Sequence, residues 1–308
     1  MVTHQTLKIA ILGGGVFGRY HIQKSLAHSK VDRVTLYEPN AERAQLIADE
    51  LGIEVMPSVE AAIAQSDAVI ITAPALNHAE LAIAALEAGR HCLIEKPLSH
   101  TLEAAQHICD LAEDKNLIVH VGHQERYVLS AIGLDTIFSK PRMIEMHREN
   151  KFNPRGTDVS VTLDLTVHDL DMVMWLLKGE PLGILATGES VQTALIDRSR
   201  AELIYEKTKA VIHTSRTAQT PRRSMTLTYP EGVVEIDFNA RSLVNKSPFM
   251  LNEDFANHPL AKDALKASDH DFFDAILSGK PSVISPKDGM RALDWALQID
   301  ALILGTQS

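Results

Sequence analysis

Three aspartates and a histidine interrupt the otherwise apolar stretch LDLTVHDLDMVMWLLKG at residues 163–179. On a helix that turns about 100° per residue, Asp164, His168 and Asp171 share a stripe about 60° wide. Apolar residues fill almost every other direction, so we predict a helix that is buried nearly all round. Because isolated buried charges are costly, the carboxylates and the imidazole must share a polar pocket, a setting typical of proton transfer.

Three kinds of site fit this stripe. His168 could be a core histidine bonded to the aspartate four residues earlier. His168 and Asp164 could instead share a metal ion, but no third and fourth ligands follow at a recognisable spacing, and we predict no metal. We favour acid–base catalysis, in which His168 takes a hydroxyl proton while Asp164 orients the ring and stabilises the imidazolium.

A glycine motif near the N-terminus predicts a phosphate cradle. Gly13, Gly15 and Gly18 stand in G-x-G-x-x-G order, after the apolar run LKIAIL and at the start of a helical stretch. Such glycines allow a tight turn, close approach of a pyrophosphate and packing of helix on strand, with the helix dipole facing the phosphates. The alternative is a glycine-rich turn that binds nothing.

An acidic residue specifies the dinucleotide. Glu38 ends the next strand, VTLYE, twenty residues beyond Gly18, where a carboxylate would bond a ribose 2′-hydroxyl and repel a 2′-phosphate. NAD is therefore favoured over NADP. Arg43 on the following helix could still contact a phosphate, so NADP is disfavoured and not excluded.

Lys96 follows the fifth predicted strand in RHCLIEKPLSH, and ligands of open parallel sheets bind outside the carboxyl ends of the strands. It could face the reactive end of a cofactor or be an exposed surface lysine. His78 opens the helix after the fourth strand and could equally be a helix-start residue without a ligand. The predicted cofactor contacts are Gly13, Gly15, Val16, Phe17, Gly18, Glu38, Ala73, Pro74, His78, Glu95, Lys96 and Gln124.

The order of apolar runs and amphipathic stretches predicts an α/β chain of two domains. Strand and helix alternate up to about residue 122, which predicts an N-terminal Rossmann domain, 1–124, with a doubly wound parallel sheet. After a helix predicted at 128–138, consecutive strands with short polar links predict an α+β domain, 125–308, for substrate binding and oligomerisation, with an open, mostly antiparallel sheet. The open face favours self-association.

Composition excludes several classes of protein. The 308 residues include 45% hydrophobic ones, enough for a sizeable core. A net charge of −10 opposes nucleic-acid binding. No apolar run is long enough to span a membrane, and the N-terminus does not resemble a secretory leader. Two cysteines form no disulfide framework or metal pattern, so we expect a cytoplasmic protein.

Five segments carry a family resemblance: GGGVFGRYH, TAPALNH, EAGRHCLIEKPLS, DLTVHDLD and FFDAILSGKPSVISPKDGMRALDWAL. Together they resemble the glucose-fructose oxidoreductase, inositol dehydrogenase and rhizopine-catabolism (Gfo/Idh/MocA) family over nearly the whole chain. The resemblance implies an NAD(P)-dependent oxidoreductase that transfers a hydride between the cofactor and a secondary alcohol of a sugar, cyclitol or sugar nucleotide. It also implies that Lys96 is the active-site lysine, that Asp164 and His168 are the catalytic acid and histidine pair, and that the second sheet mediates a homodimer or homotetramer.

The substrate side is less specific. The segment DVSVTLDLTVHDLD resembles the branch that oxidises the 3-hydroxyl of UDP-N-acetylglucosamine. Cations before the helix suit a phosphorylated substrate, although a solvated basic loop fits them equally well. The candidate substrate contacts are Arg126, Lys151, Asn153, Arg155 and Asp171. An alternative function is a regulatory protein that senses NADH without catalysis, but a sensor would not need the Lys96, Asp164 and His168 set.

Overall fold

The computed structural model describes residues 6–154 and 156–306, and the chain divides into two compact units. The first unit comprises residues 1–123 and 265–290, and the second comprises residues 124–264 and 291–308. The sequence-based division at residue 124 differs in one segment, because residues 265–290 return to the first unit.

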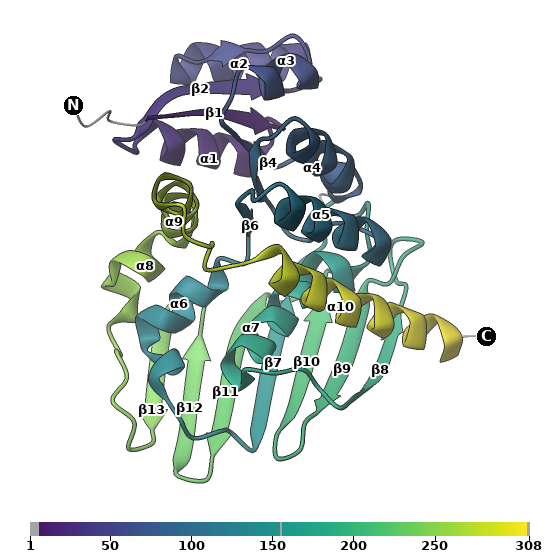
Figure 1. Ribbon diagram of the computed structural model, residues 1–308. Coiled ribbons are helices and arrows are strands. Elements are labelled where there is room, and N and C mark those ends of the chain that lie inside the picture. Colours follow the sequence, from purple (N-terminus) through teal and green to yellow (C-terminus); the bar gives the residue numbers. More distant parts are fainter. Residues whose placement is uncertain (1–5, 155, 307–308) are drawn as a thin grey trace. The chain divides into compact units, whose positions relative to one another are not determined.

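A six-stranded parallel sheet forms the first unit, in the order β3-β2-β1-β4-β5-β6 (Figure 1). Its strands are β1 (Leu7–Leu12), β2 (Val31–Tyr37), β3 (Glu54–Val55), β4 (Ala68–Ile71), β5 (His91–Ile94) and β6 (Val119–Val121). Its helices are α1 (Val16–Leu26), α2 (Ala41–Leu51), α3 (Val59–Ala64), η1 (Ala75–Asn77), α4 (His78–Glu87), α5 (Leu102–Asp114) and α9 (Ala264–Ser278). The strand order reverses between β1 and β4, the point at which ligands bind in doubly wound sheets.

Local sequence signals set the ends of the crossover helices. Helix α2 begins after Asn40, whose side chain accepts a hydrogen bond from the Arg43 N–H at 2.9 Å. It ends at Gly52, which has the left-handed φ of +66° that glycine adopts most readily.

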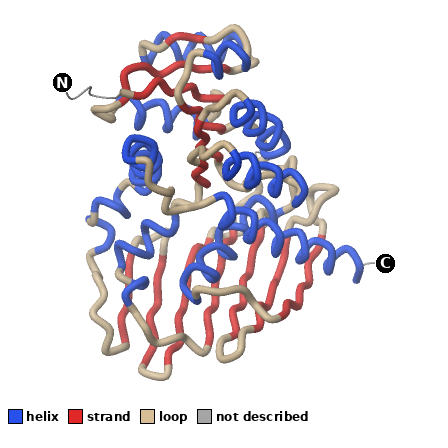
Figure 2. The backbone as a smooth tube through the Cα atoms, in the orientation of Figure 1, coloured by secondary structure: helices blue, strands red, loops and turns tan. Residues whose placement is uncertain are grey.

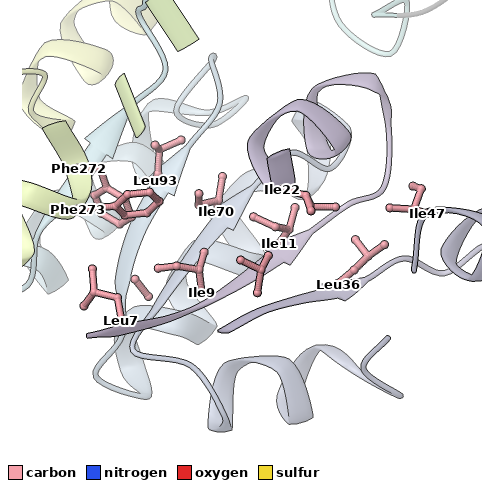
Figure 3. Close-up of a cluster of buried hydrophobic side chains, with 12 residues drawn as sticks. Leu7, Ile9, Ile11, Ile22, Leu36, Ile47, Ile70, Leu93, Phe272 and Phe273 are labelled. Atoms are coloured by element: carbon pink, nitrogen blue, oxygen red, sulfur yellow. The ribbon is translucent and has the colours of Figure 1, made fainter. Parts of the chain in front are cut away.

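The core of the first unit explains why a distant segment belongs to it. Phe272 and Phe273 of α9 are completely buried in one apolar cluster with Ile9, Ile70 and Leu93 of the central strands (Figure 3). Burying two phenylalanine side chains contributes about 3–6 kcal/mol by apolar transfer. This packing places α9 in the first unit.

The second unit contains a seven-stranded sheet, in the order β13-β12-β11-β7-β10-β9-β8, with helices over one face (Figure 2). Only the central β7–β10 pair is parallel. Its strands are β7 (Met143–Glu149), β8 (Gly183–Glu189), β9 (Arg198–Ile204), β10 (Lys209–Ser215), β11 (Arg222–Tyr229), β12 (Gly232–Asp237) and β13 (Ser242–Lys246). Buried and more exposed residues alternate along most of these strands, as expected for a sheet with one covered face.

The second unit also contains α-helices and short 3-10 and π-helical turns. They are α6 (Glu125–Ile132), η2 (Leu134–Thr136), η3 (Thr162–Thr166), α7 (Val167–Leu177), η4 (Phe255–Asn257) and α8 (Pro259–Lys262), and α10 (Pro286–Thr306) begins in the first unit and continues in the second. The sequence predicted a helix at 128–138, but α6 starts at Glu125 and ends before Gly133, which has a φ of +92°. A π-helical turn, η3, leads directly into α7. No helix within residues 6–154 and 156–306 combines the length and apolarity needed to cross a bilayer.

Candidate active site

The three motif glycines have different surroundings. Gly13 has a φ of +115°, and a Cβ atom there would lie 2.8 Å from the Ala73 backbone nitrogen. A Cβ at Gly18 would overlap the Gly13 carbonyl oxygen, so both positions need glycine for packing. At Gly15, the N-cap of α1, an added Cβ would meet nothing within 4 Å. The open space at a helix N-terminus fits an approaching pyrophosphate.

Glu38 is fixed beside the glycine turn. Its buried carboxylate accepts hydrogen bonds from the Gly14 N–H at 2.7 Å and from the Asn40 N–H at 2.9 Å. The Arg43 guanidinium lies 3.5 Å from the same carboxylate, so Arg43 is already engaged with an anion. A ribose hydroxyl could donate to this carboxylate, and that contact of Glu38 stays a prediction.

The loop after β4 lies against the glycine turn. Gly13 O accepts a hydrogen bond from the Thr72 hydroxyl at 2.8 Å, which brings Ala73 and Pro74 to the switch point. The predicted contacts Val16 and Phe17 are exposed at the start of α1. The cofactor contacts of Gly13, Val16, Phe17, Ala73 and Pro74 stay predictions.

His78 has a structural position that differs from the prediction. Its ring is buried, with Nδ1 2.7 Å from Pro97 O and Nε2 2.9 Å from Ala73 O. Burial lowers the pKa of this histidine. Both nitrogens face backbone carbonyls, so His78 supports the β4 loop and the turn after Lys96 instead of offering a nitrogen to a cofactor.

Glu95 and Lys96 follow β5 directly and differ in exposure. Lys96 is half-buried, whereas the Glu95 carboxylate is buried and lies 3.2 Å from His21 Nε2. His21 Nδ1 donates to Asp269 Oδ1 at 2.8 Å. Burial alone would lower the pKa of His21, but Asp269 and Glu95 outweigh it and raise the pKa to about 10. Glu95 thus accepts a hydrogen bond from a buried imidazolium, and its cofactor contact stays a prediction.

The predicted helix at 163–179 is present and mostly buried, and the structure adds a carboxylate partner for the histidine that the sequence did not indicate. His168 is half-buried, and its Nδ1 donates to Glu125 Oε2 at 2.9 Å. The prediction gave this orienting role to Asp164. At Nδ1 the carboxylate is Glu125, from α6, and the orienting role of Asp164 stays a prediction.

Asp164 is half-buried beside a tight backbone approach. Gly156 has a φ of +72°, and a Cβ there would lie 2.7 Å from Asp164 Oδ2. Only glycine allows the preceding loop to run this close to the carboxylate. The proton-transfer role of Asp164 stays a prediction.

Two predicted substrate contacts instead bind each other. The Arg126 guanidinium makes a bidentate pair with Asp171, at 2.8 Å from Nε to Oδ2 and 2.5 Å from Nη2 to Oδ1. Both side chains are buried. This pair joins α6 to α7, and the substrate contacts of both residues stay predictions.

The remaining predicted contacts are scattered. Gln124 is half-buried at the N-cap of α6, and Lys151 and Asn153 are exposed on the loop after β7. Arg155 lies outside the described residues. Their roles stay predictions.

One group of side chains in the described part of the chain could reach a single metal ion: Glu145, His147 and His213. It lies on the strand positions of β7 and β10 that alternate with the helix-covered ones. The two imidazole rings stack at 4.6 Å between centroids, and His147 Nε2 is 3.0 Å from Glu145 Oε1. Mutual hydrogen bonding and stacking already account for this group.

Comparison with known proteins defines the class. Residues 7–123 match the oxidoreductase family with an NAD-binding Rossmann fold, and residues 133–235 match the GFO/IDH/MocA C-terminal domain. The chain is an NAD(P)-dependent oxidoreductase of the GFO/IDH/MocA family.

Individual relatives refine this membership. The chain is 34% identical over 305 residues to the UDP-N-acetylglucosamine 3-dehydrogenase of Acidithiobacillus ferrooxidans, covering 95% of this chain and 96% of that protein. A solved structure of that enzyme superposes with a TM-score of 0.89 at 32% identity, covering 98% and 99% of the two chains. The inositol 2-dehydrogenase of Cereibacter sphaeroides is 30% identical over 184 residues, 57% of this chain and 55% of that one.

A more distant structure shares the fold. The scyllo-inositol dehydrogenase of Lactobacillus casei with bound NAD(H) and scyllo-inositol has a TM-score of 0.80 at 21% identity, covering 98% of each chain. The named relatives are dehydrogenases, which supports catalysis over the NADH-sensing alternative.

Proposed function

We propose that this protein oxidises a secondary hydroxyl of a sugar nucleotide with NAD, and that the 3-hydroxyl of UDP-N-acetylglucosamine is its substrate. The observation that carries the reaction type is the half-buried His168 with its Nδ1 bonded to a carboxylate. The choice of substrate rests on the relative from Acidithiobacillus ferrooxidans, which matches nearly the whole chain.

The chemistry at His168 follows from its tautomer. With the Nδ1 proton donated to Glu125, Nε2 keeps its lone pair and can accept the proton of a substrate hydroxyl. Glu125 then stabilises the imidazolium that forms. Bound NAD would accept the hydride released from the carbon that bears this hydroxyl. For Lys96 we propose the role that the family resemblance implies, with its ammonium donating a hydrogen bond to the reacting oxygen.

Cofactor choice rests on the first unit. The open space at Gly15 suits a pyrophosphate, and the buried Glu38 carboxylate suits two ribose hydroxyls better than a 2′-phosphate. We therefore propose NAD over NADP.

We also propose that the protein is a cytoplasmic homodimer or homotetramer, joined through the second sheet. Leu185, Ile204 and Val244 are exposed side chains on β8, β9 and β13 that a partner could cover. The two cysteines are buried free thiols, in keeping with a reducing compartment. Light scattering after size exclusion would measure the subunit number, and a monomer would contradict the assembly.

The decisive experiment follows NADH absorbance with UDP-N-acetylglucosamine, UDP-N-acetylgalactosamine, free N-acetylglucosamine and myo-inositol, each with NAD and with NADP. We expect turnover with NAD and a UDP-sugar, and loss of at least about 10²-fold in a Lys96→Ala variant that still binds NADH by fluorescence. An exposed lysine of the first unit, Lys115→Ala, is the matched control. Tight NADH binding with no turnover on any sugar would contradict the proposal.

A further inference from the structure

Glu125 is the meeting point of three basic side chains in the second unit. Its Oε2 accepts from His168 Nδ1 at 2.9 Å, and its Oε1 accepts from Arg223 Nη2 at 2.7 Å and from Arg148 Nη1 at 3.3 Å. The Glu125 side chain is only 10% exposed. One buried carboxylate therefore divides its hydrogen-bonding capacity between a histidine and two guanidinium groups.

The sheet forces the two arginines together. Arg148 on β7 and Arg223 on β11 are directly paired residues of neighbouring antiparallel strands, on the face that bears the buried residues. Like charges in directly opposed positions destabilise a sheet unless anions intervene. Burial and the neighbouring Arg148 lower the pKa of Arg223, which reflects this crowding.

A second carboxylate completes the charge balance. Asp169 Oδ1 accepts from Arg148 Nε at 3.0 Å and from Arg148 Nη2 at 2.7 Å. Two arginines thus face two carboxylates, Glu125 and Asp169, before any charge on His168 is counted. Of the other acids on the same helical segment, Asp171 is paired with Arg126, and Asp164 lies beside Gly156.

We infer that Arg148 and Arg223 are positioning residues that tune His168 through Glu125. By occupying Oε1, they weaken the hold of the carboxylate on an imidazolium and so lower the proton affinity of His168. The catalytic consequence rests on the proposed function, in which His168 is the base. The effect on the histidine's proton affinity does not depend on catalysis.

The protonation of the cluster agrees with this assignment. Burial alone would raise the pKa of Glu125, but His168, Arg148 and Arg223 outweigh it and hold the pKa well below its usual range. Burial alone would lower the pKa of Arg148, but Asp169 and Glu125 outweigh it and raise the pKa. Glu125 and Arg148 therefore stay charged throughout the physiological range.

Arg223 offers the clean variant. Its side chain is 36% exposed, and its guanidinium lies 5.3 Å from the centre of the Phe238 ring. Replacing it removes one cation from Glu125 without opening a sealed cavity. Arg222→Gln is the matched control, because Arg222 is the adjacent residue of β11, is exposed, and points to the other side of the sheet.

The test is an NMR titration of the His168 ring in the full-length protein. We expect Arg223→Gln to raise the pKa of His168 by about 0.5–1 unit, a 3- to 10-fold gain in proton affinity, and Glu125→Gln to lower it by a similar amount. The acid limb of the kcat/KM profile should move with the titration, a shift that a merely structural role would not produce. Arg222→Gln should leave both unchanged.

The outcomes separate this inference from the proposed function. An unmoved His168 titration in Arg223→Gln overturns the tuning role even if His168 proves essential, and this variant decides the matter if Glu125→Gln does not fold. A shifted titration in a protein whose His168→Asn variant keeps full activity supports the tuning and removes the base.

Discussion

The two units each contain a histidine bonded to carboxylate, and the charges around the two histidines differ. His21 of α1 is fully buried with one ring nitrogen on Asp269 and the other on Glu95. His168 of α7 is half-buried, with Nδ1 on a carboxylate that two arginines also bind.

This difference indicates that the surrounding charges, more than the pairing itself, decide the protonation state of a histidine. With two carboxylates and a pKa raised to about 10, His21 is a cation at physiological pH and has no lone pair to accept a proton. His168, the proposed base, lies on a carboxylate that it shares with two arginines. If the proposed tuning holds, a histidine beside an acid serves as a base only when other cations offset that acid.

The largest expected effect is on turnover and tests the proposed base, His168. His168→Asn should lower kcat by about 10²–10⁴-fold, because asparagine cannot accept the hydroxyl proton, while NADH binding and thermal stability stay near wild type. Steady-state kinetics and NADH fluorescence measure this. His213→Asn, in the same unit but on β10, is the control, and equal activity in the two variants would rule out His168 as the base.

The next largest effect is on stability and tests the buried His21. His21→Gln leaves two buried carboxylates without their cationic partner, so we expect the free energy of unfolding in urea to fall by about 3–5 kcal/mol. His107→Gln, on an exposed position of α5, should change it by less than about 0.5 kcal/mol. A His21 variant as stable as wild type would mean that no buried imidazolium bridges Glu95 and Asp269.

The smallest expected effect is the pH dependence of the stability that His21 provides. Because folding raises the pKa of His21 from 6.5 to about 10, its stabilisation is complete below pH 6.5 and is lost as the pH rises toward 10. Between pH 7 and 9 the wild-type free energy of unfolding should fall by about 2 kcal/mol. The His21→Gln variant should lack this slope, and an identical slope in both proteins would assign the loss to other groups.

Local signals made the first unit readable from sequence. The three glycines, Glu38 and the alternation of strands and helices lie within a short segment whose rules are geometric. The return of α9 was missed because Phe272 and Phe273 pack on strands that lie far away along the chain.

The second unit was readable in outline only. The buried helix at 163–179 followed from its apolar pattern, but Glu125 was missed because the helix carrying it was expected to start at Val128. Its partners Arg148, His168 and Arg223 lie 23, 43 and 98 residues away along the chain. The one available signal was a charged Glu-Arg pair directly after a buried strand.

The π-helical turn at Thr162–Thr166 has a consequence for how this chain tolerates insertions and deletions. A π turn holds one residue more than an α turn, so removing Leu165 would allow a continuous α-helix and rotate everything before it by about 100° about the axis. Ser160 and Thr162, whose hydroxyls both bond Asp300 of α10, would swing away from that anchor. A one-residue deletion here would therefore separate Ser160 and Thr162 from Asp300 while leaving His168 in place.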